Sequence, residues 1–295
     1  MTTAGGIVDS ITSLLHGYGA TQDRVTPLAS SMLAGDTSFT VTAAFGQAVG
    51  IAPGVVEIDG EQLYVQQVDQ ATGLCTLAAG FGRGYHGTVA TTHAAGASVV
   101  SRPKFPRINI FNTMNEVVGG VFPELFVPKT YSTTFTYPSN TYTIPGSRVV
   151  DVLDCQYLHP MGDWYRLPSF SVDSFDGTIR VGSAPMSALG RPLRFVYATE
   201  PTLFTSETDD FVTVTGLPIT SADVISLGTT AKMVVGLDIS RAQLSSVEQS
   251  DRSRVVPPSA GINVGKYLMA EYQTRLQNEA RSLRRLYKPR ISRRF

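Results

Sequence analysis

The chain has 295 residues, in which 24 Lys and Arg balance 24 Asp and Glu. This length favours two or three domains over one small core, and the charged fraction of 16 % is below the usual quarter. Cys75 and Cys155 lie in no metal-binding spacing and give no disulfide framework. No apolar run reaches the roughly twenty residues of a transmembrane helix, so we expect a protein made in the cytosol with no membrane partner.

The first hundred residues change from a helical to a strand pattern. Apolar residues of segment 7–18 recur at helical spacing, which predicts a short amphipathic helix. From about residue 21 to residue 103 the apolar period becomes two. Asp59-Gly60 lies between VVEI and EQLYV, which is a strong hairpin signal. We therefore expect an inserted, barrel-like module of about five strands.

Helical spacing returns over residues 107–122, through Ile110, Met114 and Val121, and Pro123 and Pro128 close the segment. Residues 129–215 again alternate, with turn signals at residues 138–140 and at Asp176-Gly177. This region predicts a second antiparallel module of sandwich or barrel type.

The last eighty residues read as helices. A helix is expected from Thr220 or Ser221 to Gly236, a short second helix over residues 237–247, and a loop over residues 248–263. A final helix is predicted from Val264 to Tyr287, where Pro289 stops it. The residues expected to pack between helices are Ile225, Leu227, Val234, Leu268, Tyr272, Leu276 and Leu283.

Together these patterns predict an α+β fold. N-terminal, central and C-terminal helices would form one bundle, from which two antiparallel β modules protrude. The expected parts are an N-terminal helix (1–20), an inserted β module (21–103), a central helix (104–128), a β domain (129–215), C-terminal helices (216–288) and an extended basic tail (289–295).

Catalytic and cofactor motifs are largely missing from the sequence. Gly80–Gly84 is glycine-rich but precedes no helix, so we interpret it as a β turn rather than a phosphate loop. His86 and His93 are seven residues apart without a nearby cysteine or carboxylate, which is not a zinc spacing. We predict no catalytic residue, no metal and no cofactor. The acidic pairs Asp209-Asp210 and Asp173/Asp176 keep a glycan-degrading enzyme as the least favoured alternative.

Charge is concentrated at the C-terminus. Residues 266–295 have a net charge of +7, and the preceding residues have a net charge of −7. A solvated helix face explains the basic residues up to Tyr287, but not those beyond Pro289. We expect the tail to dock on an acidic protein surface, with non-specific contact to DNA second. The predicted docking residues are Lys288, Arg290, Ile291, Arg293, Arg294 and Phe295.

Two stretches of sequence resemble virion proteins of tailed bacteriophages. RGYHGTVATTHAAGASVV (83–100), preceded by the hairpin EIDGEQLYVQQVDQATGLCTL, resembles a short β motif that recurs in such proteins. GLPITSADVISLGTTAKMVVGLD (216–238) and MAEYQTRLQNEARSLRRLYKPR (269–290) resemble the C-terminal helices of head-to-tail adaptors. The layout is similar to that of the tail tubular protein of short-tailed phages.

The resemblance implies a structural protein of the virion neck, assembled in the host cytoplasm. A ring of about twelve neighbouring copies would join the portal protein to the tail, contact a tail, stopper or nozzle protein, and form part of the channel for DNA ejection. Viral DNA would pass through the lumen without specific binding, and the basic tail would reach the portal. A tail, baseplate or fibre-attachment component is the main alternative.

Overall fold

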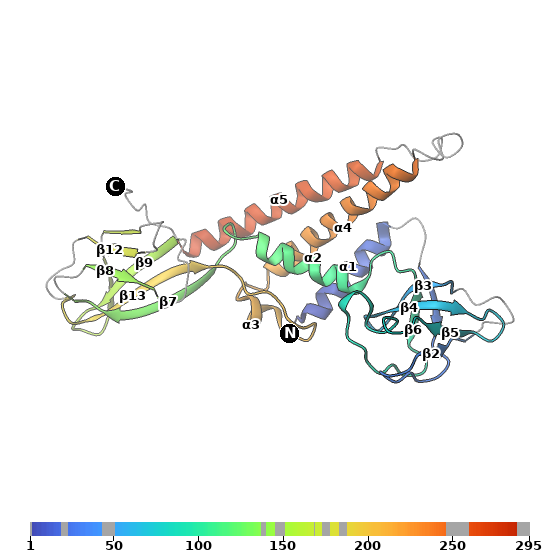
Figure 1. Ribbon diagram of the computed structural model, residues 1–295. Coiled ribbons are helices and arrows are strands. Elements are labelled where there is room, and N and C mark those ends of the chain that lie inside the picture. The colour runs from blue at the N-terminus through green and yellow to red at the C-terminus, as the bar shows by residue number, and fades with distance from the viewer. Residues whose placement is uncertain are drawn as a thin grey trace. The chain divides into compact units, whose positions relative to one another are not determined.

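The computed structural model of the protein describes residues 2–18, 23–42, 51–136, 140–144, 151–167, 169–172, 178–182, 188–245 and 260–287 (Figure 1). The chain divides into two compact units. The six-stranded unit comprises Gly6–Met114 and Thr229–Ile262, and the two-sheet unit comprises Met1–Gly5, Asn115–Gly228 and Asn263–Phe295. The division falls within four helices, α1, α2, α4 and α5, each of which contributes residues to both units.

The α+β class predicted from the sequence is confirmed. The described helices are α1 (Ala4–Tyr18), α2 (Arg107–Gly120), α3 (Phe211–Thr215), α4 (Ser221–Ser245) and α5 (Ala260–Leu286). In the six-stranded unit, Arg107 of α2 pairs with Asp9 of α1, and Thr113 of α2 donates to Met233 Sδ of α4 at 3.4 Å. None of the described helices has the length and apolarity needed to cross a membrane.

Three helix boundaries differ from the prediction. Helix α4 continues through Gly236 to Ser245, so the expected break and separate short helix were wrong. A single glycine within a helix costs only about 1 kcal/mol, which need not end it. Helix α5 begins at Ala260, within the segment expected to be a loop. Helix α3 lies in the region predicted to be β, where Asp210 caps it by accepting from the backbone N–H of Thr213 at 3.0 Å.

The six-stranded unit contains one antiparallel sheet of order β1-β6-β3-β4-β5-β2. Its strands are β1 (Arg24–Pro27), β2 (Ser38–Thr40), β3 (Gly54–Ile58), β4 (Glu61–Val68), β5 (Leu74–Leu77) and β6 (Ser98–Ser101). The predicted hairpin joins β3 to β4, with Ile58 opposite Glu61. Asp59 and Gly60 both have positive φ, of 47° and 85°, as a two-residue type I′ turn requires.

The sequence predicts a barrel-like module, but this sheet is not closed into a barrel. In the described residues, its edge strands β1 and β2 are joined only by an isolated bridge between Leu28 and Val41. The sheet nevertheless has its own apolar core, with fully buried side chains from every strand but β1. Leu28, Met32 and Ile51, from segments outside the strands, complete that core. Closure by hydrogen bonding is therefore not needed to exclude water from it.

The two-sheet unit carries two further antiparallel sheets. The four-stranded sheet has the order β10-β9-β13-β7, and the three-stranded sheet has the order β11-β12-β8. Their strands are β7 (Val127–Thr134), β8 (Thr141–Thr143), β9 (Asp151–Leu158), β10 (Trp164–Arg166), β11 (Phe170–Val172), β12 (Thr178–Val181) and β13 (Pro192–Thr199).

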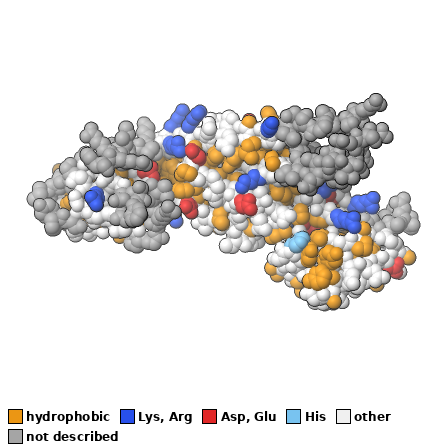
Figure 2. Space-filling model, turned by 45° about the horizontal axis from the view of Figure 1, so that its top comes forward, with side chains coloured by type: hydrophobic (Ala, Val, Ile, Leu, Met, Phe, Trp, Pro, Cys, Tyr) orange, Lys and Arg blue, Asp and Glu red, His pale blue; other side chains and the backbone are white. Residues whose placement is uncertain are grey.

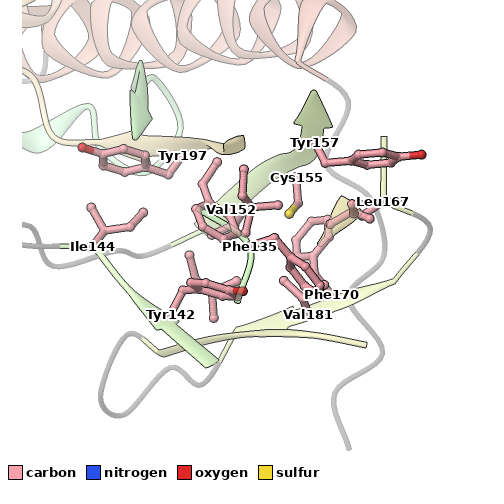
Figure 3. Close-up of a cluster of buried hydrophobic side chains, with 14 residues drawn as sticks. Phe135, Tyr142, Ile144, Val152, Cys155, Tyr157, Leu167, Phe170, Val181 and Tyr197 are labelled. Carbon is pink, nitrogen blue, oxygen red and sulfur yellow. The ribbon is translucent and has the colours of Figure 1, made fainter. Parts of the chain in front are cut away.

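Both sheets of this unit bury side chains in one common core (Figure 3). Phe195 of β13, Cys155 of β9 and Ile179 of β12 are fully buried there. Burial raises the pKa of the Cys155 thiol to about 12, with a smaller contribution from the charge of Asp154. Alternate residues of β9 and β13 face this core, so their other residues, including Asp154, Gln156, Arg194 and Val196, form the outer face of the sheet.

Helices α2, α4 and α5 meet at Gly228 in the two-sheet unit. A Cβ atom at this position would lie 2.6 Å from Cε2 of Tyr272 in α5 and 3.0 Å from Cγ1 of Val117 in α2. The distance to Tyr272 is shorter than real Cβ contacts and the distance to Val117 is tight, so a side chain at position 228 would require the ring of Tyr272 to shift away from α4.

Replacing this glycine should therefore loosen the helix packing. We expect Gly228→Ala to lower the free energy of unfolding by about 1–3 kcal/mol, because the ring of Tyr272 must move away. Urea unfolding followed by circular dichroism at helix wavelengths would measure the change. Gly120→Ala in α2 is the matched control, because its Cβ would meet nothing within 4 Å. If both variants have the same stability, the close contact does not constrain the packing.

Candidate functional site

The first candidate site is the segment that carries the virion-protein resemblance, and it is organised by one buried carboxylate. Glu61, at the start of β4, is 2 % exposed. Arg83 donates to it through Nε at 2.8 Å and Nη2 at 2.9 Å. The backbone N–H groups of Gly84 and Thr91 donate at 3.0 and 2.9 Å, and Nε2 of His93 lies 2.9 Å away. Glu61 thus holds both ends of segment 83–93 against the sheet.

His93 is fully buried between two acidic side chains. Its Nε2 lies on Glu61, and its Nδ1 lies 3.0 Å from Oδ2 of Asp59. The expectation that His93 has no carboxylate nearby was wrong, because the tight turn of the β3–β4 hairpin brings Asp59 and Glu61 to it.

Hydrogen bonding outweighs burial in setting the charge of Glu61. Burial alone would raise the pKa of this carboxyl. The hydrogen bonds from Arg83, from the backbone of Thr91 and Gly84, and from His93 instead lower the pKa to about 2. The carboxylate is therefore ionised at neutral pH. In the described part of the chain, no group of three or more His, Cys, Asp or Glu is arranged to hold a metal ion.

Glycines of the same segment are required by close backbone contacts. A Cβ at Gly82 would lie 2.5 Å from the carbonyl oxygen of Ala78. Gly84 has a left-handed backbone with φ of 57°, and its Cβ would lie 2.6 Å from the carbonyl oxygen of Thr88. The glycine-rich stretch is thus a turn, as predicted, and its composition follows from packing.

A cluster of rings from this segment and from neighbouring residues reaches the surface at Phe81 and His86. The ring centroids of Tyr64 and Phe81 are 5.5 Å apart, those of Tyr64 and Tyr85 are 5.3 Å apart, and the ring of His86 lies 4.0 Å from that of Tyr85. Phe81 is 55 % exposed. Figure 2 shows hydrophobic side chains gathered on the surface of the six-stranded unit. An exposed apolar cluster of this kind is typical of a protein-contact surface.

The second candidate site lies at the C-terminal end of α5. A groove of about 400 Å³ separates this end from the outer face of the four-stranded sheet. It is lined by Leu153, Asp154, Gln156, Arg166, Val196, Arg285, Leu286 and Tyr287. Arg166 pairs with Asp154 at 2.8 Å, and Arg285 is exposed on the opposite wall. The groove therefore combines two guanidinium groups, one paired carboxylate and an apolar floor.

Contacts with the segment after α2 fix the end of α5 in the two-sheet unit. The ring of Tyr287 packs edge-on against that of Phe126, with centroids 6.4 Å apart. Arg284 pairs with Glu124 at 2.8 Å. The predicted docking residues Lys288, Arg290, Ile291, Arg293, Arg294 and Phe295 lie outside the described residues. Tyr287 lines the groove, and the eight residues 288–295, which include these six, follow it in the sequence.

The seven residues expected to pack between helices occupy buried or half-buried positions. Ile225, Val234, Leu268, Leu276 and Leu283 are buried, and Leu227 and Tyr272 are half-buried. Burial raises the pKa of the Tyr272 hydroxyl. Arg275 of α5 pairs with Asp223 of α4. Together with the approach of Tyr272 to Gly228, this ion pair joins α4 to α5 within the two-sheet unit.

Asp209 and Asp210, one of the two acidic pairs behind the enzyme alternative, form hydrogen bonds within their own loop and helix. Oδ2 of Asp209 accepts from the backbone N–H groups of Ser206 and Thr205 at 2.9 and 2.8 Å. These bonds lower the pKa of Asp209. The neighbouring Asp210 caps α3, and its pKa is lowered by hydrogen bonds from Thr213. The other pair, Asp173 and Asp176, lies outside the described residues.

No protein-family model matches this sequence, and no curated protein matches it significantly.

Breaking the Glu61 cluster should destabilise the six-stranded unit in a pH-dependent way. We expect Glu61→Gln to lower its free energy of unfolding at pH 7 by about 2–4 kcal/mol, because Arg83 and His93 lose a buried charge partner. The folded-state pKa of about 2 lies below the ordinary 4.5. The stabilisation is therefore complete above pH 4.5 and is lost as the pH falls towards 2. Urea unfolding between pH 7 and pH 3 would measure a shrinking difference from the wild type.

The matched control for this variant is Glu124→Gln. Glu124 also pairs with an arginine, but its side chain is 48 % exposed, so a change below about 1 kcal/mol is expected. A difference between wild type and Glu61→Gln that stays constant with pH would contradict the assigned charge of Glu61.

Proposed function

We propose that the protein is a structural component of a tailed-phage virion, a head-to-tail adaptor that joins the portal to the tail. The observation that carries this proposal is the basic groove at the end of α5, from which the C-terminal segment continues. Residues 281–295 contain seven Lys and Arg and no acidic residue. In the described part of the chain, Arg284 of this set is paired with Glu124, whereas Arg285 faces the groove unpaired.

The mechanism proposed is assembly rather than catalysis. A groove lined by two arginines and followed in the sequence by a basic segment suits docking on an acidic protein surface, because complementary charge speeds encounter and fixes register. Each contact in a ring of about twelve copies can be weak, since binding of one copy raises the effective concentration of the next contact. The resemblance of segments 216–238 and 269–290 to adaptor helices supports this proposal, and the α4–α5 packing is compatible with it.

The aromatic cluster favours a second candidate function. The rings of Tyr64, Phe81 and Tyr85 contact one another in and beside the stretch that resembles a virion-protein motif, and Phe81 is 55 % exposed. A tail, baseplate or fibre-attachment component would use such a surface to bind another virion protein.

Labelling of virions separates these two functions. Gold-conjugated antibodies raised against the purified chain should bind at the head–tail junction in electron micrographs of virions opened by mild denaturant. Label at the tail tip or on fibres would favour the second candidate. Purified virions that contain none of the chain by mass spectrometry would overturn both.

The basic arm should supply most of the affinity for the portal. Replacing Lys288, Arg290, Arg293 and Arg294 by glutamine keeps the length of the arm but removes four charges. We expect binding to the purified portal ring of the same phage to weaken about tenfold or more at physiological salt, measured by biolayer interferometry. Arg275→Gln is the control within α5, since Arg275 already pairs with Asp223 and Glu271. Equal portal binding by wild type and the four-residue variant would refute docking by the arm.

A further inference from the structure

We infer that the groove beside α5 binds an extended acidic segment of a partner protein, in which acidic side chains alternate with aliphatic ones. This inference deepens the proposed function, on which it rests for the identity of the partner as a virion protein. Three observations support it: the arginines that face the groove, the apolar residues of its floor, and the contacts of nearby aromatic rings with other side chains of the protein.

The charges facing the groove favour an anionic ligand. Arg166 lies on the sheet side and Arg285 on the helix side, so two guanidinium groups face one space. The single carboxylate there, Asp154, is held by Arg166, by Nε2 of Gln156 at 2.7 Å and by the backbone N–H of Cys155 at 3.0 Å. The carboxylate of Asp154 is thus already paired and hydrogen-bonded, and the guanidinium of Arg285 can bind an anionic ligand.

A further cation, Arg194, lies on the same outer face of the sheet, next to Gln156. Arg194 donates to Oε1 of Gln156, a residue that lines the groove, and its guanidinium lies 4.2 Å from the ring centroid of Trp164. Its Nε is buried without a hydrogen-bond partner. The field in the groove is therefore positive, and carboxylates suit guanidinium groups because they accept paired hydrogen bonds.

The floor of the groove distinguishes a peptide from a simple anion. Leu153 and Val196 come from β9 and β13, and Leu286 of α5, which is 77 % exposed, lies on the helix side. An extended strand places successive side chains on opposite sides. A segment that alternates acidic and aliphatic residues can therefore meet the arginines and the leucines together, and a volume of about 400 Å³ holds a few residues of it.

The aromatic side chains argue against single-stranded nucleic acid. Binding of that kind uses free ring faces on which bases stack. Here the ring of Trp164 is covered by Arg194, and the ring of Tyr287 packs edge-on against that of Phe126. The rings near the groove are engaged by the protein's own side chains, so the basic surface offers charge without a stacking platform.

Fluorescence of the single tryptophan of the chain, Trp164, reports on this site. A capped hexapeptide of alternating glutamate and leucine should change the emission of the full-length protein and saturate below about 1 mM. The same peptide with glutamine for glutamate should bind at least about tenfold more weakly, because its side chains form no charge-assisted hydrogen bonds. A short single-stranded oligonucleotide should bind more weakly than the acidic peptide.

Variants connect this binding to the groove. Arg285→Gln alone should weaken peptide binding several-fold, and Arg166→Gln with Arg285→Gln about tenfold or more. The control is Arg281→Gln, an exposed arginine one turn earlier on α5, with an expected change within about twofold. No saturation by 1 mM, equal binding of the two peptides, tighter binding of the oligonucleotide, or unchanged binding by the double variant would overturn the inference.

The outcomes distinguish this inference from the proposed function. Peptide binding that depends on Arg166 and Arg285, without the chain at the virion neck, would keep the groove as an acidic-peptide site and refute the adaptor. Neck labelling without peptide binding would keep the adaptor and refute the groove as its docking site.

Discussion

The close approach of α4 and α5 at Gly228 is the constraint on which the helical part of the two-sheet unit depends. The ring of Tyr272 occupies the space that a side chain at Gly228 would fill, and Val117 of α2 closes the same space from another side. Leu268, Leu276 and Leu283 of α5 are buried as well. Since Arg284 and Tyr287 anchor the end of this helix to Glu124 and Phe126, the helix packing also places the groove.

A buried charge has the corresponding role in the six-stranded unit. Leaving Glu61 ionised away from water would be costly, and five hydrogen bonds from segment 83–93 compensate for that cost. The side chains that make these bonds, Arg83 and His93, are the conspicuous residues of the stretch that resembles virion proteins. Their contacts explain why the motif holds a surface loop in place, and the exposed ring of Phe81 beside it is left for recognition.

Periodic patterns and turn chemistry could be read from the sequence, whereas contacts between distant segments could not. The Asp59-Gly60 turn and the stripe of α5 follow from local rules of backbone geometry and amphipathicity. Helix α4 continues through Gly236 although a glycine in a helix costs about 1 kcal/mol. A cost this small does not decide from local propensity whether the helix ends there. The pairing of Glu61 with His93, and the meeting of Arg166 with Arg285, join residues far apart in the chain. The acidic residues beside the hairpin turn were the only available signal for the first pairing.

The arginines of α5 differ in whether a carboxylate of the same unit balances their charge. Arg275 and Arg284 of α5 have carboxylate partners within their own unit, so their charges are locally compensated. Arg285 has none in the described part of the chain, and it faces a groove whose opposite wall carries Arg166. Attraction for an anion is greatest where cations converge on a partly enclosed space, because the field there is less screened by water than on an open surface. The proposed recognition surface therefore depends on Arg166 and Arg285, whose guanidinium groups face the groove from its two walls.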